Sequence, residues 1–162
     1  MDSSKKSTNS LVEATEYIHN LTDTYLQHIG GELTADNMEK LTANQHTLLA
    51  YRILLDEVME GGFIQLIQNG YAPYVLDGPF PMMIKKMWGL VDFGKFLYEV
   101  KKEYHRHKEE LEADLDEDAF MALYEQCDTI NEMGDEFLDD HQEEVTPAIA
   151  NYVQEHEQDF II

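Results

Sequence analysis

Apolar residues recur every three or four positions along most of this chain of 162 residues, which is the spacing of amphipathic α-helices. The clearest example lies in the C-terminal third, where the apolar or small residues of one stripe are Phe120, Leu123, Cys127, Ile130, Gly134 and Phe137. This stripe predicts one helix from just after Asp116 to about Asp140. No alternating pattern in the sequence is long enough to indicate a strand. We therefore predict an all-α fold, an irregular bundle of about seven or eight helices.

Local signals set the limits of the first helices. Ser10 and Glu13 have the spacing of a capping box, at the start of a helix that ends at the glycines 30–31. Apolar residues lie on nearly all sides of residues 44–60, which predicts a central, deeply buried helix. The glycine pair 61–62 is expected to end this helix.

Farther along the chain, three of the four prolines fall between Tyr71 and Pro81 and predict a loop. A long helix is expected from about Val91 to Ala113. Thr146 followed by Pro147 predicts the start of the last helix, with the threonine as its N-cap.

Length and composition indicate a single all-helical domain over residues 11–162, because 43% of the residues are hydrophobic and supply enough apolar mass for one core. Residues 1–10 are polar and are expected to form a flexible tail. The chain has neither an apolar run of membrane-spanning length nor the apolar segment of a secretory signal near Met1. We therefore expect a cytoplasmic protein.

The charge of the chain is concentrated at one end. Residues 109–162 carry 19 Asp and Glu residues and no Lys or Arg, whereas residues 1–108 carry 14 acids and all 11 Lys and Arg residues. A net charge of magnitude about 2 to 8 already keeps a small domain soluble. Solubility alone therefore does not explain the net charge of −22. Because nucleic acids and anionic membranes would be repelled, the expected partner is a basic protein.

Five acids of the predicted C-terminal helix keep the rhythm of the apolar stripe but fall on the opposite side: Glu125, Asp128, Glu132, Asp135 and Asp139. Residues three or four apart lie roughly 5 Å apart along a helix axis. Phosphates of one DNA strand repeat every ~3.4 Å along the duplex axis. This similarity of spacing and sign predicts a surface that imitates DNA and binds the DNA site of another protein. The other acids assigned to that surface are Glu117, Asp118, Glu136, Asp140, Glu143 and Glu144.

Two segments resemble a known protein family. They are "EVMEGGFIQLIQN", residues 57–69, and "IANYVQEHEQDF", residues 149–160. From Tyr51 onward the chain is similar to the bacterial DNA-mimic protein family, small acidic all-helical proteins formerly classed as a domain of unknown function. The resemblance implies a helical fold, a homodimer, no enzymatic activity and, in some members, a carboxylate surface that occupies the DNA site of a transcription factor. The first motif lies at a helix end and is expected to fix the junction between two helices.

Two other binding functions stay open. One is an immunity-type inhibitor that caps a basic toxin such as a nuclease. The other is a divalent-cation site in residues 114–125, because Asp114, Asp116, Asp118 and Glu125 have the spacing of an EF-hand loop, although Ala119 stands where the loop needs glycine. A third alternative explains the acids structurally, without a binding partner. In it, the cations of the basic stretch from Lys95 to Lys108 fold back against the acids.

The sequence gives little support for a catalytic site or a metal site. Cys127 is the single cysteine and lies on the apolar stripe, which favours a buried structural thiol. Glu16 and His19 have the spacing of helical di-iron ligands, but no second Glu-x-x-His pair exists to complete such a site. His105 and His107 are two residues apart and point to different faces of a helix. We therefore predict no catalytic residue, no cofactor and no metal site.

Overall fold

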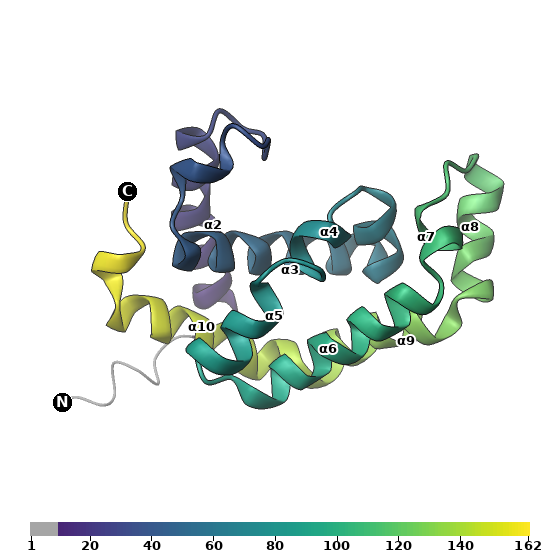
Figure 1. Ribbon diagram of the computed structural model, residues 1–162. Helices are drawn as coiled ribbons and strands as arrows, with labels where there is room; N and C mark the ends of the chain where they lie inside the picture. The colour runs from purple at the N-terminus through teal and green to yellow at the C-terminus, as the bar shows by residue number, and fades with distance from the viewer. Residues whose placement is uncertain (1–9) are drawn as a thin grey trace. The chain divides into compact units, whose positions relative to one another are not determined.

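The computed structural model describes residues 10–162, and all regular structure in this part of the chain is helical (Figure 1). In chain order the elements are α2 (Leu11–His28), η1 (Met38–Lys40), α3 (Ala43–Gln68), α4 (Ala72–Val75), α5 (Phe80–Met82), η2 (Met83–Met87), α6 (Val91–Arg106), α7 (Lys108–Glu112), α8 (Glu117–Gln126), α9 (Asp128–Glu136), η3 (Phe137–His141), α10 (Gln142–Glu155) and η4 (Glu157–Asp159). Within residues 10–162, seven α-helices have five residues or more, so the predicted all-α fold is confirmed.

The chain divides into two compact units. Of the described residues, one unit contains 10–52 together with Gln142–Ile162, and the other contains Ile53–His141. Helix α3 contributes its first part to one unit and the rest to the other. The single domain expected from composition stays a prediction. The expected flexible tail lies outside the described residues except for Ser10, which caps α2 through the predicted capping box with Glu13.

In the first unit, α10 packs against α2. The Tyr25 hydroxyl donates a hydrogen bond to the carbonyl oxygen of Phe160 at 2.6 Å. The hydroxyl oxygens of Tyr51 and Thr146 lie 2.6 Å apart in the core. The prediction that Thr146 caps the last helix is therefore wrong: its hydroxyl is used in a buried tertiary contact, and Pro147 lies inside α10.

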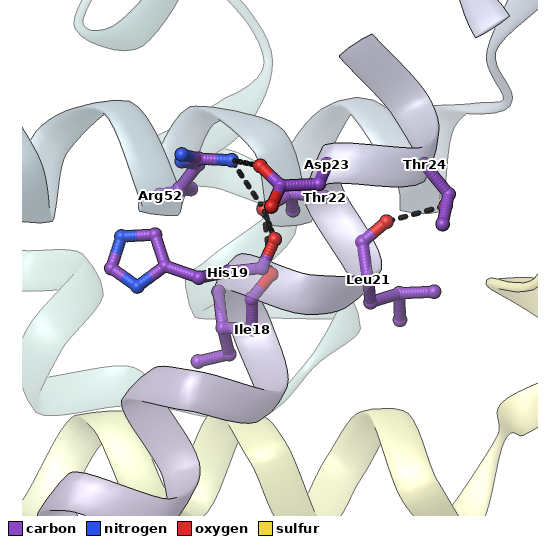
Figure 2. Close-up of polar contacts among 7 residues, drawn as sticks. All are labelled: Ile18, His19, Leu21, Thr22, Asp23, Thr24 and Arg52. Atoms are coloured by element: carbon purple, nitrogen blue, oxygen red, sulfur yellow. Dashed lines mark hydrogen bonds and ion pairs between the residues drawn. The ribbon is translucent and has the colours of Figure 1, made fainter. Parts of the chain in front are cut away.

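Polar contacts join α2 to the start of α3 in the same unit. Figure 2 shows the Arg52 guanidinium pointing toward α2, where it donates to Asp23 Oδ1 at 2.6 Å and to the Thr22 hydroxyl at 3.3 Å. The Thr22 hydroxyl in turn donates to the Ile18 carbonyl at 2.6 Å. Because the Asp23 side chain is 53% exposed, this ion pair contributes at most about 1 kcal/mol.

The second unit is built around a kink in α3. Gly62 has φ +73° and ψ −175°, a conformation that essentially only glycine adopts. Across this kink the Glu57 carboxylate accepts hydrogen bonds from Asn69 Nδ2 at 2.7 Å and from Gln65 Nε2 at 3.4 Å. These contacts agree with the interpretation that the motif of residues 57–69 fixes the junction between two helices.

Helices α8 and α9 lie against the kink. The Tyr124 hydroxyl of α8 donates to the Gly61 carbonyl at 2.8 Å. A Cβ added to Gly134 of α9 would lie 3.5 Å from the Gly62 Cα, so the two backbones are in close contact. Five of the six residues of the predicted apolar stripe are buried, and the sixth, Phe120, is partly buried.

The predicted single helix from Asp116 to Asp140 is nevertheless wrong. Cys127, with φ −114° and ψ +51°, separates α8 from α9, and a π-helical turn follows in η3. The stripe stays in phase because the Cys127 N–H still bonds to the Leu123 carbonyl and the Asn131 N–H to the Cys127 carbonyl. The hydrogen bond from Tyr124 to the α3 kink holds α8 in a direction different from that of α9. This tertiary contact cannot be predicted from the spacing of apolar residues in the sequence.

Two more boundaries differ from the sequence-based prediction. The helix expected over residues 91–113 is interrupted at His107, which separates α6 from α7. The proline-rich segment 71–81 is not a plain loop, because the chain forms α4 there and begins α5 at Phe80. Proline is tolerated in both short helices because it lies in their first turn.

Gly62→Ala tests the importance of the kink. Alanine is strained at this φ and ψ, and its Cβ would also lie 3.3 Å from Asn131 Oδ1. We expect a loss of about 1–3 kcal/mol in the free energy of unfolding, measured by urea denaturation. Met59→Ala, at an exposed position of the same helix, should change it by less than about 0.5 kcal/mol. Equal effects of the two substitutions would contradict the role given to Gly62.

Candidate acidic binding surface

All eleven acids predicted to bind a partner are exposed. Three lie on α8 (Glu117, Asp118 and Glu125), four on α9 (Asp128, Glu132, Asp135 and Glu136), two in η3 (Asp139 and Asp140) and two at the start of α10 (Glu143 and Glu144). The first nine belong to the second unit and the last two to the first. The apolar stripe explains this exposure, because its buried residues turn the opposite sides of α8 and α9 to solvent.

The break at Cys127 changes the predicted geometry of these acids. Figure 1 shows α8 turning away from the line of α9, so the acids of these two helices do not lie along one straight axis. Within α9, Asp128, Glu132 and Asp135 are four and three residues apart and share one face. Successive carboxylates of this face are separated by roughly 5 Å along the helix axis. The single straight ladder is therefore replaced by a short row on α9 with further acids before and after it.

The cations of α6 and α7 pair within their own stretch of chain. Arg106 Nη1 lies 2.5 Å from Glu103 Oε1, Lys102 Nζ lies 3.5 Å from Glu99, and Lys108 Nζ lies 4.0 Å from Glu112. Lys102 and Arg106 therefore do not fold back against the acids of residues 109–162, whereas Lys108 does pair with one of them, Glu112.

A cleft beside the acidic row was not predicted. It has a volume of about 580 Å³, and η2, α6, α9 and η3 supply its lining: Lys85, Asp92, Lys95, Phe96, Tyr98, Glu99, Met133, Glu136 and His141. The Lys85 amine lies 5.5 Å from the centre of the Tyr98 ring. The centres of the His141 and Phe96 rings lie 4.5 Å apart. With aromatic walls and charges of both signs, the cleft suits a charged side chain. Sequence reasoning missed it because only the packing of α6 against α9 and η2 brings these residues together.

The structure contradicts the alternative of an EF-hand-like cation site in residues 114–125. Helix α8 begins at Glu117, so most of the supposed loop is helical. Asp116 is the N-cap, and its carboxylate accepts the Ala119 N–H at 2.8 Å. Asp118 and Glu125 lie seven residues apart in that helix, roughly 10 Å along its axis, which is too far for both to bind one ion.

One group of metal-binding side chains does converge in the described part of the chain. The ligand atoms of His107, Glu110 and Cys127 all lie within 4.8 Å of one another. Cys127 is only 2% exposed, as the apolar stripe predicted. Burial raises the pKa of the Cys127 thiol, and the nearby carboxylates of Glu110, Glu103 and Asp128 raise it further. The thiol is therefore protonated at neutral pH.

Comparison with known proteins identifies the family. The family model described as DMP19-like protein matches residues 39–156, which is well over half of the chain. The chain belongs to the DMP19-like protein family. The match spans all eleven exposed acids of the candidate surface. It confirms the assignment to the DNA-mimic family that the motifs of residues 57–69 and 149–160 suggested.

A curated relative in this DMP19-like family is the DNA mimic protein DMP19 of Neisseria meningitidis serogroup B. It is 27% identical over 149 residues, and the alignment covers 91% of this chain and 88% of the relative. Crossing a bilayer requires a long apolar helix, and the helices formed by residues 10–162 include none that qualifies.

Slow alkylation of Cys127 would verify its burial and raised pKa. With a chelator present at neutral pH, we expect iodoacetamide to modify the folded protein roughly tenfold or more slowly than a free cysteine derivative, because only the thiolate reacts. The rate should rise with pH and should reach that of the free thiol in urea. Mass spectrometry follows the modification. A folded protein that reacts as fast as the unfolded one would contradict this description.

Proposed function

We propose that this chain is a DNA mimic that binds the basic DNA-binding site of another protein, a transcription factor in the first instance. The observation that carries the proposal is the exposure of all eleven predicted acids, nine of which lie on α8, α9 and η3 of the second unit. The family assignment supports it, since the relative from Neisseria meningitidis is named a DNA mimic protein. The chain would then inhibit its partner by occupying the surface that DNA needs.

The row on α9 is the proposed centre of this surface. Asp128, Glu132 and Asp135 present carboxylates at a spacing close to that of phosphates along DNA, on a helix fixed by its packing against the α3 kink. Acids of α8 and η3 would contact outlying Lys and Arg residues of the partner. The net charge of −22 would speed encounter by long-range attraction, an effect that salt screens.

An immunity-type inhibitor and a DNA mimic differ in the molecule that each would exclude from its partner. A mimic of operator DNA and that DNA exclude each other from a transcription factor, whereas an immunity protein blocks a toxin that attacks its own substrate. The family assignment favours the mimic. Cytoplasmic localisation and the absence of catalysis belong to the same proposal. So does the homodimer, for which Met82, Met87 and Val91 offer exposed apolar side chains.

The salt at which a partner is released tests the α9 row. A column carrying the protein is loaded with a native lysate, DNA-binding proteins that it retains are identified, and one of them is purified. We expect the double variant Glu132→Gln, Asp135→Asn to release this partner at lower salt and to bind it about 2- to 30-fold more weakly, because two exposed charge pairs of roughly 0.2–1 kcal/mol each are lost.

A matched variant controls for net charge. Glu32→Gln with Asp36→Asn removes the same two charges at exposed positions outside the family match. It should bind as tightly as the unchanged protein. Equal weakening by both variants would mean that only total charge matters, and unchanged binding by the α9 variant would remove that row from the interface.

A further inference from the structure

Two interruptions of the helices in the second unit meet at one place. His107 separates α6 from α7 and has φ −122° and ψ +24°, and Cys127 separates α8 from α9. Glu110 of α7 lies beside both, so that the His107, Glu110 and Cys127 ligand atoms lie within 4.8 Å of one another. The proposed DNA-mimic function makes no use of this cluster.

The spacing of the cluster is close to that of a tetrahedral metal site. Bonds of ~2.1 Å to zinc place neighbouring nitrogen and oxygen ligands roughly 3.4 Å apart, and a longer bond to sulfur adds a few tenths of an ångström. His107 Nδ1 lies 3.4 Å from Glu110 Oε1, which already matches this separation. Cys127 would have to approach by at most about an ångström to complete three ligands.

A second carboxylate orients the histidine. His107 Nε2 lies 3.4 Å from Glu103 Oε2, whereas the other ring nitrogen, Nδ1, faces Glu110. Glu103 is only 6% exposed and is held by Arg106, whose Nη1 donates to Glu103 Oε1 at 2.5 Å. Metal-binding histidines characteristically donate their second ring N–H to such a carboxylate, which fixes the tautomer and the ring orientation. Orientation of the His107 ring would therefore explain why an acidic residue is buried at position 103.

We propose that His107 Nδ1, a Glu110 carboxylate oxygen and Cys127 Sγ bind a divalent transition-metal ion of the Zn²⁺ type, with Glu103 as the residue that positions His107. Imidazole, carboxylate and thiolate together suit zinc, whereas calcium and magnesium prefer oxygen ligands alone. Binding would release the thiol proton to solvent and leave a fourth position for water. Half-exposed Glu110 provides the entry path. The ion would join α7 to the α8–α9 junction, directly before the acidic row.

Titration with Co²⁺ tests the site, because a cobalt–thiolate bond absorbs in the near ultraviolet and carboxylate-bound cobalt does not. Excess Mg²⁺ is included to occupy the many surface carboxylates. We expect one equivalent of Co²⁺ to produce the thiolate band and Zn²⁺ to abolish it by displacement. Cys127→Ser should lose the band entirely, and Glu103→Gln should weaken Co²⁺ binding about 10- to 100-fold.

Two further variants make the result decisive even if the buried substitutions unfold the chain. Glu110→Gln changes an exposed side chain and should weaken Co²⁺ binding at least tenfold with the fold intact by circular dichroism. His105→Gln changes an exposed histidine two residues from the site, paired with Asp77, and should leave binding unchanged. Bound cobalt without a thiolate band in the unchanged protein, or the same affinity in Glu110→Gln and His105→Gln, would overturn the proposal.

Discussion

The close packing of α9 against the kink in α3 positions the candidate surface. Gly62 takes a backbone conformation available to glycine alone, and Gly134 offers no side chain where the two helices meet. Tyr124 adds a hydrogen bond from α8 to the same kink. The carboxylates of α8 and α9 can be held in fixed positions because the other sides of these helices are anchored at this one place.

Burial of the apolar stripe also offsets the repulsion among the acids. Like charges three or four residues apart cost a helix roughly 0.2–0.5 kcal/mol per pair. Burying a side chain such as Leu123, Ile130 or Phe137 contributes about 1.5–3 kcal/mol each, and all three are at most 2% exposed. A few buried residues therefore outweigh several repulsive pairs, so the chain can present a dense row of carboxylates and remain folded.

Features that depend on neighbouring residues in the chain were predictable from the sequence. The capping box at Ser10, the junction at the glycine pair 61–62 and the apolar stripe through Ile130 each follow from local spacing, and the structure confirms them. The exposed side of α9 follows from the stripe, since the two sides of a helix are fixed together.

Features that depend on tertiary contacts were not predictable. The break at Cys127 leaves the helical period intact, so the pattern gives no sign of it. Thr146 has the sequence of an N-cap but bonds to Tyr51, nearly a hundred residues earlier in the chain. The cluster of His107 and Cys127 likewise forms only because two helix interruptions meet in space.

Competition with duplex DNA tests the central claim most directly. A DNA-binding partner of this chain is saturated with a fluorescent copy of the protein, and its specific duplex is then titrated in while fluorescence anisotropy is followed. The account predicts that the duplex displaces the protein completely, with a midpoint that rises in proportion to the concentration of the protein. A ternary complex, in which partner, duplex and protein stay bound together, would show that the acidic surface does not occupy the DNA site.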